Sequence, residues 1–195
     1  SEEVEKYRYL AAPCRAAVPG VDEGEQLRKV EHAMRSVGMA EAEIEGVWGV
    51  LGAVLALGNV NFAPEGGSDA AHVAPGADLD AAAAAFGCGA DALREALETR
   101  RILAGREWLI KPVTPAQAED GRDALAKAVY AALFDAIVAR VNAKLAVRCE
   151  REDASRVVSI LDIYGFEFFD TNSFEQLCIN FANERLQLYF NAHLL

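Results

Sequence analysis

Apolar residues recur at intervals of three and four along two long stretches of the chain, which is the spacing of one face of a helix. In Ala40–Leu57 the repeat lies within a mostly apolar run, so we expect a buried helix that closes at Gly58. After Thr114 and Pro115, which suit a helix start, the repeat has a strict period of four and comprises Leu125, Val129, Leu133, Ile137, Val141 and Leu145. This pattern predicts one long helix that is packed along one face.

Shorter segments add to a mainly helical pattern. Their composition predicts helices over Glu25–Val37 and Asp91–Thr99. Asn172 and Ser173 are good caps for a last helix near the end of the chain. The polar segment Ala63–Gly76 is rich in glycine and proline, so we expect a surface loop there.

Two segments carry strand patterns. Arg100–Pro112 alternates between apolar and polar residues on either side of Gly105, which predicts one or two short strands. Val157–Leu161 is a β-branched run, short enough for a strand buried on both faces. The expected fold class is therefore α/β and mainly helical.

Charge and composition narrow the range of partners. The 195 residues include 30 acidic and 19 basic side chains, a net charge of −11, and no basic stripe with interleaved aromatic residues. Nucleic acid is therefore not an expected partner. No run of 18 uncharged apolar residues occurs, so we expect no transmembrane segment and a cytoplasmic protein. Because the chain lacks an initiator methionine and ends within an apolar helical pattern, we expect an internal fragment, residues 1–195, without a domain boundary.

The cysteines do not suggest a metal site. Cys14, Cys88, Cys149 and Cys178 are far apart, and none belongs to a Cys-x-x-Cys pair or has a histidine nearby. A zinc site is therefore not expected, and no metal is expected to be bound directly. We expect all four cysteines to be reduced and buried.

A strand pattern that ends in an acid and a glycine turn is the main candidate for chemistry. Asp162 follows the apolar run, Gly165 comes three residues later, and Glu167 follows the turn. In nucleoside triphosphatases, an acid at the end of a central strand lies near Mg²⁺, and a glycine amide just beyond it can bond the γ-phosphate. Asp-x-x-Gly alone leaves open a simple strand followed by a turn with a solvated aspartate.

The sequence around this turn is similar to that of myosin motor domains. Asp162–Glu167 and then Asn172–Gln187 resemble the switch II loop and the relay helix of that family almost residue for residue. Arg122–Lys127 resembles the long helix that precedes switch II, and Leu57–Phe62 and the opening at Tyr9 fit the upper 50-kDa region of the same motors. The resemblance implies part of a P-loop NTPase fold of the myosin and kinesin kind, contributing one central buried strand and several long helices.

By resemblance, three residues of the turn take part in nucleotide chemistry. Asp162 would lie in the second shell of Mg²⁺, and the Gly165 amide would bond the γ-phosphate of ATP when the loop closes. Glu167 would pair with an arginine of switch I, a motif that this chain lacks, and so close the site around the attacking water. ATP and Mg²⁺ would be bound mainly by segments outside the chain.

The resemblance makes the last helix a relay that passes closure of the loop to a distant lever. Its packing contacts would be Phe174, Phe181, Leu188 and Phe190. From the residues alone, a static core helix is the alternative.

Glu107 lies sixteen residues before Asp123, where myosins carry an acid or a phosphorylatable residue in a surface loop that touches the actin filament. A built-in glutamate would make phosphorylation unnecessary there. From the residues alone, Arg106 and Glu107 could equally form a solvated turn.

Two motifs that such a motor needs do not occur in the chain. Neither the phosphate loop Gly-x-x-x-x-Gly-Lys-Ser/Thr nor the switch I motif Asn-x-Asn-Ser-Ser-Arg is found, and the converter and neck are missing too. We expect the complete protein to be a cytoskeletal ATPase motor with light chains or calmodulin on its neck, and these residues alone to be inactive. A kinesin-like Asp-x-x-Gly switch and a non-catalytic, actin-binding scaffold are the rival interpretations.

Overall fold

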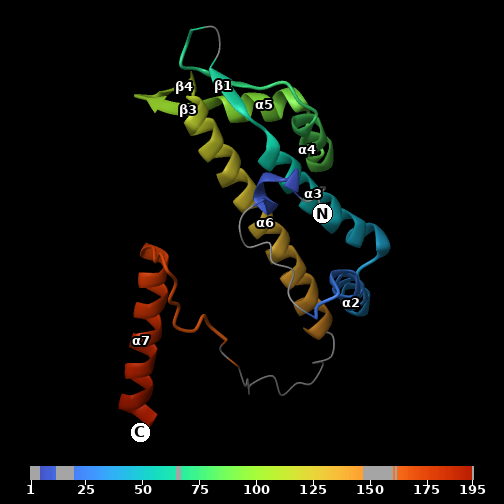
Figure 1. The fold of residues 1–195 in the computed structure, drawn as a ribbon, viewed down its shortest axis with the longest axis vertical. Coiled ribbons are helices and arrows are strands. Elements are labelled where there is room, and N and C mark those ends of the chain that lie inside the picture. The colour runs from blue at the N-terminus through green and yellow to red at the C-terminus, as the bar shows by residue number, and fades with distance from the viewer. Residues whose placement is uncertain (1–4, 12–19, 65–66, 147–159, 161, 195) are drawn as a thin grey trace. The chain divides into compact units, whose positions relative to one another are not determined.

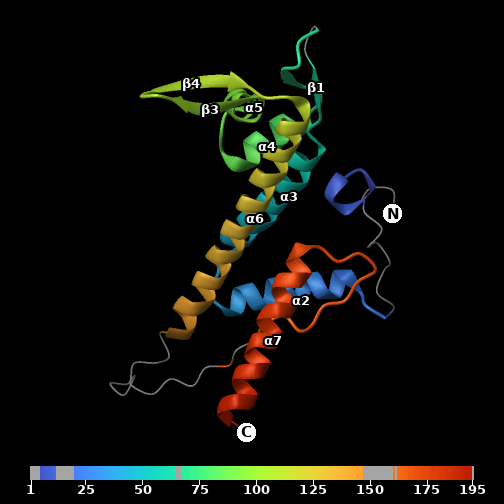
Figure 2. The same ribbon diagram turned by 90° about the vertical axis from the view of Figure 1, so that its left-hand side faces the viewer.

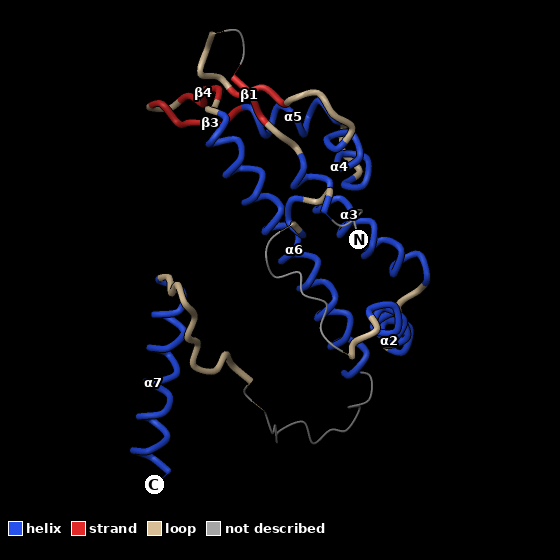
Figure 3. The backbone as a smooth tube through the Cα atoms, viewed as in Figure 1, coloured by secondary structure: helices blue, strands red, loops and turns tan. Residues whose placement is uncertain are grey.

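The chain forms two compact units, Ser1–Glu150 and Arg151–Leu195. Helices dominate the secondary structure (Figure 3). The computed structural model describes residues 5–11, 20–64, 67–146, 160 and 162–194.

The first unit is built mainly from helices, and α3 and α6 lie against each other along part of their length (Figures 1 and 2). Its helical elements are η1 (Arg8–Leu10), α2 (Glu23–Ser36), α3 (Glu41–Asn59), α4 (Asp78–Phe86), α5 (Ala90–Glu98) and α6 (Pro115–Ala146). The helices predicted from apolar spacing and composition are confirmed, with bounds that differ by a few residues.

The main core lies where α3, α4, α5 and α6 meet. Leu57 of α3 is fully buried, and Leu79 of α4 and Leu93 of α5 are nearly so. Ala82 and Ala83 of α4 are also buried, and their small side chains let α4 approach its neighbours closely. These two alanines therefore belong to the packed core.

A smaller core lies at the turn between α2 and α3. Its buried residues, packed against Leu133 and Ile137 of α6, are Met34, Met39, Ile44 and Val47. Arg140 of α6 donates a hydrogen bond to the carbonyl of Gly38 at 2.6 Å and lies 3.4 Å from a carboxylate oxygen of Glu43. The apolar contacts and this arginine together join the second half of α6 to the turn.

The described residues of the first unit also include two antiparallel hairpins. β1 (Phe62–Pro64) pairs with β2 (Ala71–Val73), and β3 (Thr99–Ala104) pairs with β4 (Glu107–Pro112). The second hairpin confirms the strands expected on either side of Gly105. The φ angle of Gly105 is +68°, a left-handed conformation that glycine adopts without steric cost.

The expected surface loop over Ala63–Gly76 is wrong for part of that segment. Ala71 and Val73 of β2 are buried, with exposed fractions of 5% and 8%. The N–H of Ala71 also donates to the carbonyl of Val113 at 2.7 Å. Strands of three residues are too short to give a clear alternating pattern in a polar, glycine-rich segment.

Within its described residues, the second unit has an extended segment followed by one helix, α7 (Phe174–Leu194). The predicted cap is confirmed, because the N–H of Glu175 donates to Ser173 Oγ at 3.2 Å. Ile160 is 93% exposed and belongs to no strand. The remainder of the predicted strand Val157–Leu161 lies outside the described residues.

The described residues are mostly helical with two small antiparallel sheets, which agrees with the mainly helical fold class. None of their helices combines the length and the apolar character needed to cross a membrane. Cys88 and Cys178 are free thiols, but both are exposed, so the expectation that they are buried is wrong. Cys14 and Cys149 lie outside the described residues.

Candidate functional site

The predicted nucleotide loop, Asp162–Glu167, lies in the extended segment that leads into α7. Asp162 and Gly165 are exposed, whereas Glu167 is partly buried. A Cβ atom added to Gly165 would meet no other atom within 4 Å. These open surroundings leave room for an anionic group to approach the backbone closely, which is what the predicted role requires.

Asn180 joins this loop to α7 through the backbone of Glu167. The N–H of Glu167 donates to Asn180 Oδ1 at 2.8 Å, and Asn180 Nδ2 donates to the Glu167 carbonyl at 2.8 Å. One side-chain amide thus pairs with both backbone groups of one residue. The backbone of Glu167 is therefore attached to the second turn of α7.

Further hydrogen bonds join the end of the loop to the start of α7. Asn172 Oδ1 accepts from the N–H of Phe169 at 3.0 Å, and Asn172 Nδ2 donates to the Phe169 carbonyl at 2.7 Å. Gln176 Oε1 accepts from the N–H and the Oγ of Ser173, and Gln176 Nε2 lies 3.4 Å from Glu167 Oε2. Loop and helix start therefore form one hydrogen-bonded assembly.

An apolar groove lies between the loop and α7. It has a volume of about 510 Å³ and is lined by Ile163, Tyr164, Gly165, Phe166, Asn183, Leu186, Gln187, Tyr189 and Phe190. Asn183 Nδ2 is buried and has no hydrogen-bond partner among the described residues. Because buried amides are normally paired in native proteins, the groove is suited to a segment that brings a hydrogen-bond acceptor.

The four predicted relay contacts are all largely exposed. Phe174, Phe181 and Leu188 are 76%, 63% and 55% exposed, and Phe190 is 51% exposed. The first three are seven residues apart, so they lie along one face of α7, while Phe190 lies near the opposite face. Large apolar side chains that share a face of an exposed helix mark an interaction surface.

Glu107 is the first residue of β4 and follows the turn of the β3–β4 hairpin. It is exposed and pairs with Ala104 across the hairpin. The next residues, Trp108 and Ile110 among them, are 67% and 58% exposed. The predicted partner-contacting residue therefore lies at an accessible hairpin end that carries both charge and apolar surface.

A partly buried hydrogen-bond network holds η1 against α3 and α6. Tyr9 Oη donates to Asp123 Oδ1 at 2.5 Å, and Arg122 Nε donates to the same oxygen at 2.8 Å. The Arg122 side chain is 2% exposed and also donates to the Val60 carbonyl at 2.8 Å. The ring of Tyr9 packs directly on Gly58. This network links the start of the chain to the middle of the first unit.

The titration behaviour of the network points to a structural role. The pKa of Tyr9 is raised to about 12, mainly by burial of the side chain and next by its hydrogen bond to Asp123. Burial alone would raise the pKa of Asp123, but the hydrogen bonds from Arg122 and Tyr9 outweigh it and lower this pKa. Arg122 and Asp123 therefore stay ionised and Tyr9 stays protonated near neutral pH, so none of the three is suited to proton transfer.

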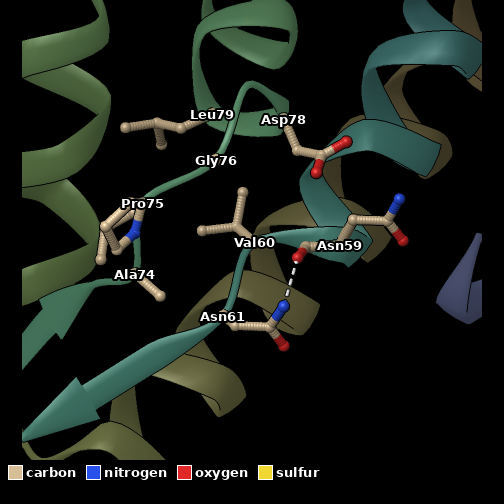
Figure 4. A pocket seen from close by; sticks show the side chains of 9 residues that line it. Asn59, Val60, Asn61, Ala74, Pro75, Gly76, Asp78 and Leu79 are labelled. Carbon is tan, nitrogen blue, oxygen red and sulfur yellow. Dashed lines mark hydrogen bonds between the residues drawn. The ribbon is translucent and has the colours of Figure 1, made fainter.

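A small hollow at the end of α3 does not match a nucleotide site. Asn59, Asn61 and Asp78 are among its lining residues (Figure 4), and Asn61 Nδ2 donates to the Asn59 carbonyl at 2.8 Å. The hollow has a volume of about 60 Å³, whereas small-molecule sites usually measure about 300–1,000 Å³. The described part of the chain also contains no group of acids, cysteines and histidines that could bind a metal ion.

Local sequence patterns indicate the loop and the helix, but they do not indicate Asn180, which joins the two. Asn180 gives no local signal, because its partner Glu167 lies 13 residues earlier. Ser173 and Gln176 do have the Ser-x-x-Gln spacing of a capping box, which is the signal that predicts their contact.

The sequence matches one family along its whole length. The profile of the myosin head (motor domain) matches residues 1–195. The chain is 42% identical over 189 residues to Myosin-3 and 44% identical over 191 residues to Myosin-1, both from Arabidopsis thaliana, covering 97% of this chain and 16% of each relative. It is 36% identical over 194 residues to the Myosin-J heavy chain of Dictyostelium discoideum, covering 98% of this chain and 9% of that protein. The chain thus spans only a small part of each relative's length, and it belongs to the myosin head (motor domain) family.

Proposed function

We propose that these residues form the part of an actin-based, ATP-hydrolysing motor that senses the γ-phosphate and passes the signal to a lever. Asp162 lies in the second shell of Mg²⁺, the Gly165 amide bonds the γ-phosphate, and Glu167 pairs with an arginine from another segment. Family membership and the open backbone around Gly165 support this proposal. Other segments supply most of the ATP and Mg²⁺ site, so these residues alone lack activity.

The observation that carries the proposal is the pair of hydrogen bonds between Asn180 and the backbone of Glu167. When the loop closes, the Glu167 backbone moves, and Asn180 transmits that displacement to α7. The helix has 21 residues, which corresponds to a length of about 30 Å. The exposed face at Phe174, Phe181 and Leu188 supplies the packing contacts through which α7 displaces the lever-side segments.

The test compares Asn180→Ala with Asn191→Ala in the complete motor. Asn191 lies on the same helix and is exposed, so its replacement removes an amide without touching the loop. Asn180→Ala should leave ATP affinity unchanged but shift the ATP-driven equilibrium of the lever by about tenfold, because two backbone hydrogen bonds are lost. A fluorescence pair placed across the lever measures that equilibrium. Identical lever movement in the two variants would refute the coupling role.

The β3–β4 hairpin is the proposed site of actin contact. Glu107 supplies a permanent negative charge at the hairpin end, next to the exposed Trp108. Phosphorylation is therefore not needed to create charge at this position. Light chains or calmodulin bind a neck outside these residues, and the complete protein acts on the cytoskeleton.

A further inference from the structure

Gln176 uses the two ends of its side-chain amide for different partners. Oε1 accepts from the N–H of Ser173 at 2.8 Å and from Ser173 Oγ at 2.6 Å. A backbone N–H can only donate, so Ser173 fixes the oxygen end of the amide towards itself. The nitrogen end then faces Glu167, with Nε2 at 3.4 Å from Oε2.

The side chain of Glu167 is held much more loosely than its backbone. Asn180 bonds the N–H and the carbonyl of Glu167 at 2.8 Å each. Within the described residues, the carboxylate has only the long contact from Gln176, which leaves Oε1 without a donor. Both oxygens of a carboxylate can accept hydrogen bonds. Gln176 can therefore orient the Glu167 carboxylate through Oε2, while Oε1 accepts a hydrogen bond from a second donor.

We propose that Gln176 is a positioning residue for Glu167, a role that rests on the proposed function of Glu167 given above. The amide nitrogen holds one carboxylate oxygen so that the other is presented to the incoming arginine. Gln176 also caps α7 by accepting hydrogen bonds from Ser173. The orientation of the Glu167 carboxylate is therefore linked to the position of the first turn of α7. A contact of 3.4 Å is weak enough for the carboxylate to adjust as the guanidinium arrives.

Gln176→Glu in the complete motor separates positioning from capping. A glutamate keeps the oxygens that accept from Ser173, and Ser-x-x-Glu is itself a capping box, so the helix start is preserved. The donor to Glu167 is replaced by a second carboxylate, which repels it. We expect the single-turnover rate of ATP hydrolysis to fall by about tenfold or more with ATP affinity unchanged. Gln176→Ala, which removes the donor without adding charge, should lower the rate by about threefold.

Ser173→Ala is the matched control, because it removes the capping hydroxyl but keeps the backbone N–H at position 173, which still fixes the oxygen end of the Gln176 amide. Its hydrolysis rate should stay within about twofold of the parent. A normal rate in Gln176→Glu, or an equal loss in Ser173→Ala, would overturn the positioning role. Glu167→Ala is measured in parallel: if it hydrolyses ATP normally, the proposed function itself fails. If Glu167→Ala is inactive and Gln176→Glu is normal, only the positioning role fails.

Discussion

At the scale of single residues, Tyr9 packs tightly against Gly58. A Cβ atom at position 58 would lie 2.6, 2.7 and 3.0 Å from atoms of the Tyr9 ring. The ring cannot easily move away, because its hydroxyl is bonded to Asp123. Glycine is therefore required here by a side chain that is 49 residues away in sequence.

Gly58→Ala should lower the free energy of unfolding by about 1–3 kcal/mol, because overpacking displaces the Tyr9 ring. Gly52→Ala is the control on the same helix, since a Cβ there meets nothing within 4 Å. The control should instead raise stability by about 0.5–1 kcal/mol through helix propensity. Urea unfolding of the two variants measures both values, and stabilisation by Gly58→Ala would contradict the packing described.

The pKa of Tyr9, raised to about 12 from 10.0, predicts a loss of stability in base. Because the folded-state pKa exceeds the unfolded value, the contribution of Tyr9 is fully present below pH 10 and disappears as the pH rises towards 12. After allowance for partial exposure, it amounts to about 1–2 kcal/mol. The free energy of unfolding should fall between pH 9 and pH 11.5, and this fall should be smaller for Tyr9→Phe than for the parent protein. Equal differences would show that this hydroxyl makes no such contribution.

At the scale of elements, the two long helices were predictable because their apolar residues repeat over many turns. α3 and α6 contain 19 and 32 residues, enough for repeats at intervals of three and four to stand out. β1 and β2 contain three residues each, so no alternation could indicate them. The hydrogen bonds from Arg122 to the Val60 carbonyl and from Tyr9 to Asp123 were not predictable either, because a single sequence does not reveal contacts between segments so far apart.

In the candidate site, too, features with a local sequence pattern were predictable and contacts between distant residues were not. Asp162, Gly165 and the cap at Ser173 could be located from local patterns. The bonds from Asn180 to Glu167 could not, because they depend on how the extended segment folds back onto α7.

Replacing each of two glycines by alanine tests the backbone conformations of α6 and of the β3–β4 turn. Gly121 lies within α6, and a Cβ there meets nothing within 4 Å, so Gly121→Ala should raise the free energy of unfolding by about 0.5–1 kcal/mol. Gly105 has a φ of +68° in the β3–β4 turn, so Gly105→Ala should lower the free energy of unfolding by about 1 kcal/mol. Thermal or urea unfolding of both variants suffices, and effects of the same sign would contradict either the helix or the turn.

At the scale of the whole molecule, the two units differ in how much apolar surface they bury. The first unit has buried clusters around Leu57 and around Ile44. The second exposes aromatic side chains along both its loop and its helix, with Phe168 at 90% and Tyr164 at 73%. Exposed apolar surface on this scale is typical of a part that packs against other segments, as the proposed relay requires.

The most direct test of the central claim is Gly165→Ala in the complete motor, with ATP binding and single-turnover hydrolysis measured separately. A Cβ at this position meets nothing within 4 Å, so the loop itself tolerates the change and any loss reflects the approach of the phosphate. We predict normal ATP affinity and a hydrolysis rate reduced by about 100-fold or more. An unaltered hydrolysis rate would contradict the role of this loop as the γ-phosphate sensor.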